Sequence, residues 1–216
     1  MNITTKDLLQ VKHLSSELTS KIKFSNVSTD SRTVKKGDLF IALRGEKFDG
    51  HEFIAQVAKQ GAKAAIVDAK WFRKTTKRPK LNYLVVKDTT QAMGELARLY
   101  RLKFEIPILA IGGSNGKTTT KELVAHVLGT SFNVLKTEAN FNNQVGVPQM
   151  LFRITSKHEI AVLEIGTNHP GEIAWLTNVI EPTHTLITNI GREHLEFFKN
   201  LDGVAKEETS AFFISE

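Results

Sequence analysis

A short apolar run that leads into a glycine-rich turn is the feature that most constrains how this chain can fold. The run is Ile106–Ile111, and Gly112-Gly113-Ser114-Asn115-Gly116-Lys117-Thr118 follows it directly. A tight glycine turn between a strand and a helix exposes successive backbone N–H groups next to the helix N-terminus. Such a group of N–H donors binds an anion. The order therefore predicts a strand–loop–helix unit of an α/β fold.

The turn predicts a nucleotide-phosphate site, with a plain strand-to-helix turn as the alternative. The Lys117 side chain can reach β- and γ-phosphates, and the Thr118 hydroxyl can bind Mg²⁺. Only three residues separate Gly112 from Gly116, where the general phosphate-loop pattern has four, which disfavours a generic NTPase. The predicted nucleotide-binding residues are Gly113, Ser114, Asn115, Gly116, Lys117, Thr118 and Thr119.

The rest of the second half alternates apolar runs with helical patterns. Strands are predicted at 133–135, 159–165 and 185–190, and helices at 117–128, 144–152, 171–180 and 201–213. Such alternation predicts a three-layer parallel sheet, in which ligands bind at the carboxyl ends of the strands. Glu164 ends one strand and can hold Mg²⁺ directly or through water, with an exposed strand-end acid as the alternative. His194 follows the last strand, although a lone histidine is more often structural.

The two halves of the chain differ in charge. Residues 1–104 hold 21 Lys and Arg against 10 Asp and Glu, whereas residues 105–216 hold 8 against 13. We therefore predict two units, 1–87 and 88–216, the second opening with a helix after Asp88. The densest basic run, 70–80, is expected to be a solvated loop between two strands, and a nucleic-acid contact is the alternative.

Composition excludes several classes of protein. The chain has no cysteine, which excludes disulfides and cysteine-ligated metal sites. It has no apolar run of about 18 residues, so a transmembrane helix is not expected. Its first residues lack the basic and apolar regions of a signal peptide, so the expected location is the cytoplasm.

An uncharged polar stretch precedes the predicted helix at 144–152. It reads Asn140-Phe141-Asn142-Asn143-Gln144 and offers many hydrogen-bond donors and acceptors. These side chains can cap the helix. Alternatively, they can hold a carboxylate or a phosphoryl intermediate.

Taken together, these segments resemble the Mur ligase family, in which the shortened phosphate loop is the usual form. The resemblance is carried by the loop itself and by Thr137–Pro148, Glu164–Thr167, Pro170–Ile173, Thr188–Gly191 and His194–Glu196. In the first half, Ser28–Arg32, Gly37–Gly45 and Phe48–Phe53 are similar to the family's uridine-nucleotide domain. The resemblance implies a small α/β uridine-nucleotide domain at 1–87, followed by an incomplete central ATP-binding domain at 88–216.

The resemblance also implies an activity. The implied activity is that of an ATP-dependent carboxylate–amine ligase that uses Mg²⁺. The implied catalytic residues are Lys117, Glu164 and His194. The implied metal ligands are Thr118, Glu164 and His194. Within the family, the Asn-rich stretch points to a UDP-N-acetylmuramoyl-tripeptide and D-alanyl-D-alanine as substrates. A monomer without nucleic-acid or membrane partners is expected. The implied substrate-binding residues are Ser28, Thr29, Asp30, Ser31, Arg32, Asp49, Gly50, His51, Asn140, Asn142 and Asn143.

The chain departs from the family pattern in two respects. The family carries a carbamylated lysine in the helix after the histidine, and Glu208 stands at that position, two residues after Lys206. We predict that the Glu208 carboxylate faces inward and takes the place of the carbamate at a second Mg²⁺. Family members also have three domains, so these residues alone are expected to be inactive. The alternatives are another Mur ligase, a folylpolyglutamate-synthase-like ligase, or a non-catalytic nucleotide-binding fragment.

Overall fold

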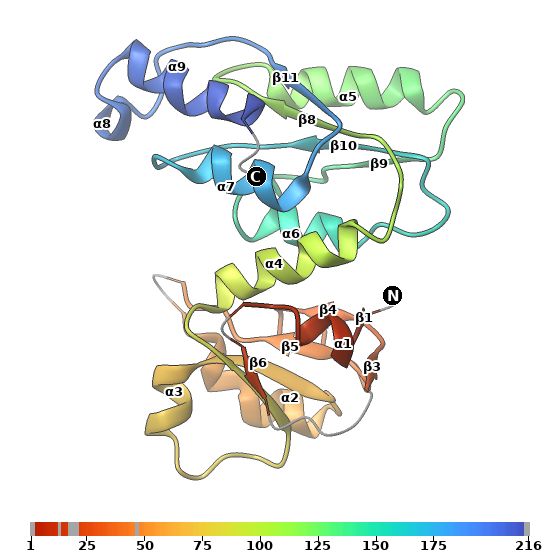
Figure 1. Cartoon of the computed structure of the whole chain (residues 1–216), viewed down its shortest axis with the longest axis vertical. Coiled ribbons are helices and arrows are strands. Elements are labelled where there is room, and N and C mark those ends of the chain that lie inside the picture. The colour runs from red at the N-terminus through yellow and green to blue at the C-terminus, as the bar shows by residue number, and fades with distance from the viewer. Residues whose placement is uncertain (1–2, 13, 17–21, 46–47, 214–216) are drawn as a thin grey trace. The chain divides into compact units, whose positions relative to one another are not determined.

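Two compact units make up the chain, residues 1–100 and residues 101–216, and each is built on its own sheet (Figure 1). The computed structural model describes residues 3–12, 14–16, 22–45 and 48–213. The predicted α/β class is confirmed in both units. Among the described residues, no helix combines the length and the apolar character that a membrane span requires.

The first unit holds a five-stranded sheet. Its strands, in spatial order, are β2 (Ser15–Ser16), β7 (Asn82–Val86), β6 (Ala64–Asp68), β5 (Leu39–Ile41) and β4 (Val27–Ser28). Strands β4 to β7 are parallel and β2 is antiparallel to β7. The short strands β1 (Ile3–Thr4) and β3 (Lys23–Phe24) form a separate antiparallel pair. Because β4 to β7 are parallel, their carboxyl ends lie along one edge of the sheet.

Helices of the first unit are short except for the last. They are α1 (Thr5–Leu8), a 3₁₀ turn at Gly50–Phe53, α2 (Ile54–Lys59), α3 (Ala69–Lys74) and α4 (Thr89–Arg101). Ile54 and Val57 of α2 pack against Phe40 and Ala65 of the sheet in one buried cluster. Trp71 and Phe72 of α3 pack against the same cluster. This shared cluster places α2 and α3 on the same face.

The basic run contains a helix, so the prediction of a loop from residue 70 to residue 80 is wrong for its first half. The Asp68 side chain accepts a hydrogen bond from the Trp71 N–H at 2.7 Å and caps α3. The two aromatic side chains that follow anchor the helix to the core, while its lysines remain exposed. Local capping and aromatic packing therefore outweigh the charge run.

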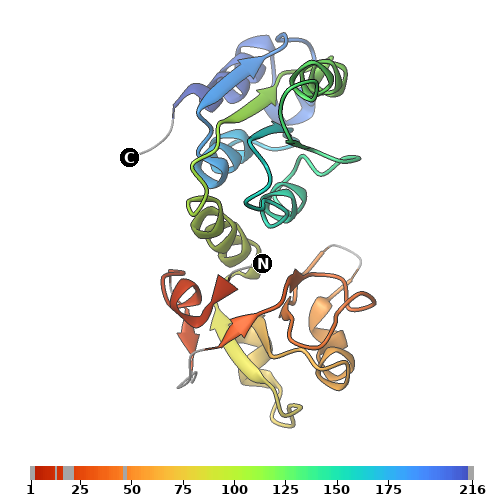
Figure 2. The same cartoon turned by 90° about the vertical axis from the view of Figure 1, so that its right-hand side faces the viewer.

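The second unit holds a four-stranded parallel sheet in the order β11 (His184–Ile187), β8 (Ile108–Gly112), β10 (Ile160–Glu164) and β9 (Val134–Lys136). Helix α5 (Lys117–Leu128) covers one face, and α6 (Gly146–Leu151) and α7 (Glu172–Ile180) cover the other (Figure 2). This arrangement follows from right-handed crossovers, since the chain reverses direction across the sheet after β9. Helices α8 (Leu195–Phe198) and α9 (Leu201–Thr209) and a 3₁₀ turn at Ser210–Phe212 follow β11.

Several boundaries differ from the sequence prediction. Helix α6 begins at Gly146, where the Asn143 side chain accepts hydrogen bonds from the N–H groups of Val145 and Gly146. The last predicted helix ends at Thr209 and continues only as a 3₁₀ turn, and α8 was not expected. The units divide after Tyr100, so α4 lies with the first unit, where Glu95 accepts a hydrogen bond from the Lys12 N–H at 2.6 Å.

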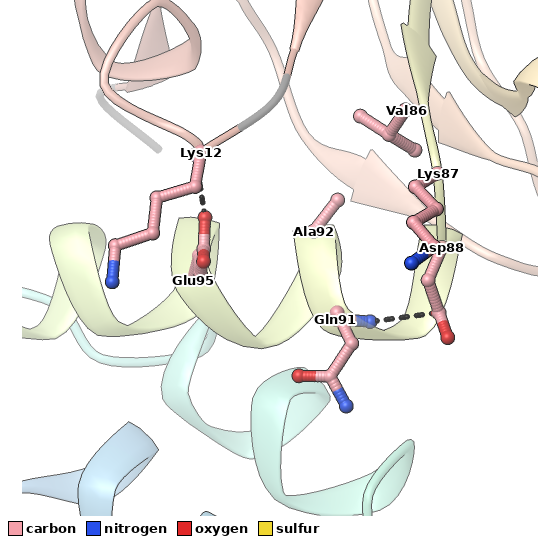
Figure 3. Close-up of a pocket in the computed structure, with 7 residues that line it drawn as sticks. All are labelled: Lys12, Val86, Lys87, Asp88, Gln91, Ala92 and Glu95. Atoms are coloured by element: carbon pink, nitrogen blue, oxygen red, sulfur yellow. Dashed lines mark hydrogen bonds between the residues drawn. The ribbon is translucent and has the colours of Figure 1, made fainter.

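A pocket of about 230 Å³ lies beside the start of α4 (Figure 3). Its wall includes two basic residues, Lys12 and Lys87, and two acidic residues, Asp88 and Glu95. None of the predicted site residues lines it.

Glu207 joins α9 to α7 through a buried carboxylate. Its two oxygens accept hydrogen bonds from the Gly171 N–H at 2.8 Å and the Ile173 N–H at 2.9 Å. The N–H groups at a helix start have no acceptor within the helix, so this carboxylate caps α7.

We expect Glu207→Ala to lower the free energy of unfolding of the second unit by about 2 kcal/mol, since it leaves buried N–H groups without an acceptor. The matched control is Lys206→Ala on the exposed side of α9, with an expected change below about 0.5 kcal/mol. Urea unfolding in a Trp71→Phe background reports on this unit alone, because Trp175 of α7 is then the only tryptophan. Equal effects of the two substitutions would contradict the capping role.

Candidate functional site

The glycine-rich loop lies between β8 and α5, as predicted. Gly113 and Gly116 have φ of 111° and 81°, in the left-handed region that favours glycine. A Cβ at Gly113 would lie 2.4 Å from the Thr188 hydroxyl, so the loop also needs glycine for close approach to the end of β11. Helix α5 begins at Lys117, directly after the loop, and no side chain of its N-cap residue Gly116 caps it. The first N–H groups of a helix have no acceptor within the helix, so such a start can bind an anion.

Groups from two distant segments hold the first half of this loop. The Gly113 N–H donates to Glu208 Oε2 at 2.7 Å, and the Ser114 N–H donates to the Asn189 carbonyl at 3.0 Å. The Asn189 side chain pairs with Asn115 twice, accepting from its N–H at 3.1 Å and donating to its carbonyl at 3.0 Å. Sequence reasoning did not assign Asn189 a role, because only the fold brings it to the loop.

The Lys117 side chain folds back over the loop. Its Nζ donates to the carbonyl oxygens of Gly113 and Ser114. The Thr118 and Thr119 side chains are exposed in the first turn of α5. The ammonium is therefore placed beside the position where a phosphate would meet the helix N-terminus.

The predicted strand-end carboxylate lies against the loop. Glu164 is buried, and its Oε2 accepts from the Thr118 hydroxyl at 2.9 Å while its Oε1 accepts from Asn142 Nδ2 at 2.9 Å. A hydroxyl and a carboxylate in contact are suitable Mg²⁺ ligands. Three residues predicted from separate motifs thus meet at one point.

A buried lysine is linked to the backbone of Glu164 through two hydrogen bonds of one intervening residue. Lys121 is buried one turn beyond Lys117 and donates to the Thr137 carbonyl at 2.8 Å. The Thr137 hydroxyl in turn accepts from the Glu164 N–H at 2.9 Å. Neither Lys121 nor Thr137 was predicted as a site residue, since a Lys four positions after another Lys on a helix is ordinarily a surface residue.

The three predicted asparagines have different environments. Asn142 contacts Glu164, Asn143 caps α6, and Asn140 is exposed. The two interpretations of this stretch, capping and ligand binding, therefore fall on different residues.

Glu208 faces inward, as predicted. It is fully buried, whereas Lys206 is exposed. Leu201, which was expected to face the protein, is also exposed. Burial raises the pKa of Glu208 to about 7, and the neighbouring Glu193 carboxylate acts in the same direction, against the Gly113 N–H and Lys117.

Glu208 Oε1 and Glu193 Oε1 are both buried, with no hydrogen-bond partner among the described residues. Two buried carboxylate oxygens without donors suit a cation. The described residues do not form a cluster of three or more acidic or histidine side chains here, so these two oxygens supply only part of a metal ion's ligands, and a bound nucleotide would have to supply others.

His194 adopts a left-handed conformation with φ of 45° just before α8. Its Nδ1 lies 3.8 Å from Glu196 Oε1, and its ring meets Phe198 edge-on. It makes no hydrogen bond or ion pair with Glu164 or Glu208. His194 therefore follows β11, as predicted, but its contacts are with Glu196 and Phe198 and not with the two carboxylates.

In the first unit, the predicted substrate residues gather at the carboxyl edge of the sheet. Ser28 ends β4, residues 29–32 follow it, and Asp49–His51 lie between β5 and α2. Ser28 and Ser31 are buried, Thr29 is half-buried, and Arg32 forms a bidentate pair with Asp30 on the surface. The Arg32 guanidinium lowers the pKa of Asp30 to about 2.

His51 is buried and engaged at both ring nitrogens. Its Nε2 accepts from the Asp68 N–H at 3.0 Å, so the proton of the neutral ring lies on Nδ1, beside Asp49 Oδ1. Gly50 is buried, and a Cβ there would lie 2.8 Å from the Leu43 carbonyl. Asp49 and His51 therefore organise the loop and leave Arg44, which contacts Asp49 and Asp68, at the surface.

Comparisons with known proteins agree with this geometry. A family description named Mur ligase middle domain matches residues 111–213, and one named Mur ligase family, catalytic domain, matches residues 23–101. The chain is 42% identical over 194 residues to the UDP-N-acetylmuramoyl-tripeptide–D-alanyl-D-alanine ligase of Escherichia coli, covering 88% of this chain and 41% of that protein. The enzyme of that name from Bacillus subtilis is 39% identical over 181 residues, covering 83% and 39%.

Solved structures give the same result. A crystal structure of MurF from Acinetobacter baumannii superposes with a TM-score of 0.87 at 35% identity, covering 98% of this chain and 46% of that one. The MurF ligase of Thermotoga maritima in complex with ADP gives 0.78 at 31% identity, covering 86% and 42%. The chain spans about two fifths of the length of these curated relatives.

The raised pKa of Glu208 predicts a pH-dependent stability. Between about pH 4.5 and 7, the folded protein retains a proton that the unfolded chain has lost, so stability falls as pH rises. We expect the free energy of unfolding of the second unit to drop by about 1–3 kcal/mol from pH 5 to 8, relative to Glu208→Gln. Urea titrations at each pH in the Trp71→Phe background, followed by Trp175 fluorescence, measure this difference. Parallel pH profiles of the two proteins would contradict it.

Proposed function

Because this chain belongs to the Mur ligase family, we propose that the protein is an ATP-dependent carboxylate–amine ligase. Its substrates are a UDP-N-acetylmuramoyl-tripeptide and D-alanyl-D-alanine. The observation that carries this proposal is the contact of Glu164 with both Thr118 of the phosphate loop and Asn142 of the Asn-rich stretch. The names of the relatives above support the choice of substrates.

The two units take separate parts in this proposal. Residues of the first unit, at the carboxyl edge of its sheet, bind the uridine diphosphate part of the substrate. Residues of the second unit bind ATP: the loop N–H groups and the α5 N-terminus hold the phosphates, and Lys117 leaves the Gly113 carbonyl to meet the γ-phosphate.

The reaction proceeds in two displacements. A carboxylate oxygen of the tripeptide attacks the γ-phosphorus, the bond to the bridging oxygen breaks, and ADP leaves with the electron pair. The amine of D-alanyl-D-alanine then attacks the acyl carbon, its nitrogen gives up a proton to solvent, and phosphate leaves with the electron pair of the broken C–O bond as the amide forms. Lys117 and the helix N-terminus stabilise the charge on the transferring group, and positioning supplies most of the remaining acceleration.

Mg²⁺ fits the residues present. Thr118 and Glu164 would hold one ion, and the unpartnered oxygens of Glu208 and Glu193 would hold a second. His194, the residue after Glu193, would complete this second site by turning from Glu196 toward it. When bound, the ions neutralise phosphate charge. Lys121 and Thr137 keep the Glu164 carboxylate at the end of its strand.

Lys117→Ala is expected to reduce acyl-phosphate formation in the full-length protein about 10³-fold or more, because it removes the charge beside the γ-phosphate. Binding of the UDP-substrate is expected to persist, since the uridine residues lie in the other unit. Phosphate release and calorimetric binding of the UDP-substrate measure the two effects. Loss of both in a well-folded variant would refute this division of roles.

Glu208 is tested by exchange with the family residue. We expect Glu208→Gln to lower kcat about 10²-fold or more and to raise the Mg²⁺ requirement, because the amide cannot supply a second anionic oxygen. Glu208→Lys is expected to regain activity only with added bicarbonate, which allows carbamylation. Unchanged activity and Mg²⁺ dependence in Glu208→Gln would show that this carboxylate has no role at the metal.

A further inference from the structure

The four parallel strands of the first sheet begin level with one another. Their first residues are successive partners in the pairing register, and these are Val27, Leu39, Ala64 and Asn82. The segments that lead into the strands therefore share one edge of the sheet, the amino edge, opposite the edge that holds the predicted substrate residues. Each of these segments carries exposed lysine. We call the set the lysine edge, and its members are Lys23, Lys35, Lys36, Lys59, Lys63 and Lys80.

Hydrogen bonds connect the segments of the lysine edge to one another. The Gly37 N–H donates to the Gly61 carbonyl at 2.9 Å. Lys63 Nζ donates to the Lys23 carbonyl at 3.0 Å, and the Lys63 carbonyl accepts from Asn82 Nδ2 at 2.8 Å. The lysines are therefore carried by one connected stretch of backbone and not by separate loops.

Little negative charge opposes these lysines. Asp38 is the one acidic residue in segments 23–26, 35–38, 59–63 and 80–82. It is buried, and its Oδ2 accepts from the Lys35 N–H at 2.8 Å. None of the six ammonium groups forms an ion pair with a described residue. The other acidic residues described between positions 22 and 87 lie at the carboxyl edge, and these are Asp30, Asp49, Glu52 and Asp68.

The donors available at the lysine edge favour a fluid anionic surface over a nucleic acid. All of its cations are lysines, whereas base reading and fixed phosphate contacts rely largely on the planar arginine fork. The N–H groups of Gly37 and Lys63 are bonded to carbonyls within the edge, so they cannot bind phosphates. None of the exposed large apolar side chains of the described residues lies in these segments, which leaves no aromatic platform for single-stranded bases.

We propose that the lysine edge is an interaction surface for anionic phospholipid headgroups, to which the protein binds reversibly. Long, flexible lysine side chains can follow headgroups that move laterally, and each lysine near such a surface strengthens binding about fivefold. Because no apolar side chain inserts, the attraction is electrostatic and is screened by salt. This surface was not anticipated from the sequence, from which no membrane partner is expected. A bilayer at the amino edge leaves the carboxyl edge of the sheet open to solvent.

Vesicle binding by the 216-residue chain tests the assignment. Vesicles of equal parts phosphatidylcholine and phosphatidylglycerol are compared with vesicles of phosphatidylcholine alone by co-sedimentation. We expect binding to the anionic vesicles only. Raising NaCl from about 0.05 M to about 0.3 M is expected to weaken that binding about tenfold or more.

Three double variants separate the lysine edge from overall charge. Lys35→Gln with Lys36→Gln is expected to weaken binding to the anionic vesicles about tenfold or more, because two charges are removed. Lys35→Arg with Lys36→Arg keeps both charges and is expected to bind within about twofold of the unmodified chain. The matched control is Lys157→Gln with Lys206→Gln, since both lysines are exposed in the second unit and the change in net charge is the same. Its expected effect is below about twofold.

The outcomes are distinct. Absence of binding to the anionic vesicles at low salt would overturn the proposal, and so would equal losses in the Lys35→Gln, Lys36→Gln variant and the control. A DNA duplex and a single-stranded RNA are titrated under the same conditions. Tighter binding to either one, lost in the same variant, would replace the lipid surface by a nucleic-acid surface. Since these lysines take no part in the proposed reaction, none of these results bears on the ligase assignment.

Discussion

The register of β8 against its two neighbours is the constraint on which the second unit depends. Glu164 of β10 and Leu186 of β11 both pair with Ile111, one residue before the glycine turn. The strands therefore end level, and whatever follows them meets at the same place. A shift of one residue in β10 would turn Glu164 to the opposite face of the sheet and separate it from Thr118.

Local sequence signals were sufficient where the chemistry is local. The glycine turn, the start of α5 at Lys117 and the strand ending at Glu164 follow from patterns within a few residues. The roles of Asn189 and Lys121 could not be predicted in this way, because their partners lie 74 and 16 positions away in the chain. Such contacts depend on strand order, which the apolar pattern alone does not specify.

The first unit shows the opposite limitation. Its motif residues were expected to touch a ligand, but the fold buries His51 and leaves Arg44 and Phe48 at the surface. A histidine beside an aspartate has the same appearance in a sequence whether it faces solvent or supports a loop. The capping residue Asp68 did offer a usable signal for α3, since Asp is one of the residues preferred at a helix N-cap.

The hydrogen bond between Glu208 and the Gly113 N–H has a consequence for how this position can diverge among related proteins. An unmodified lysine there would leave a buried amide of the loop without an acceptor, which costs about 1–3 kcal/mol. A carbamylated lysine restores an anionic oxygen at the end of a longer side chain. If Glu208 takes the place of the carbamylated lysine, as proposed above, the two side chains are alternative solutions to one backbone requirement. Exchange between them would then pass through a less stable protein unless carbon dioxide supplies the missing acceptor.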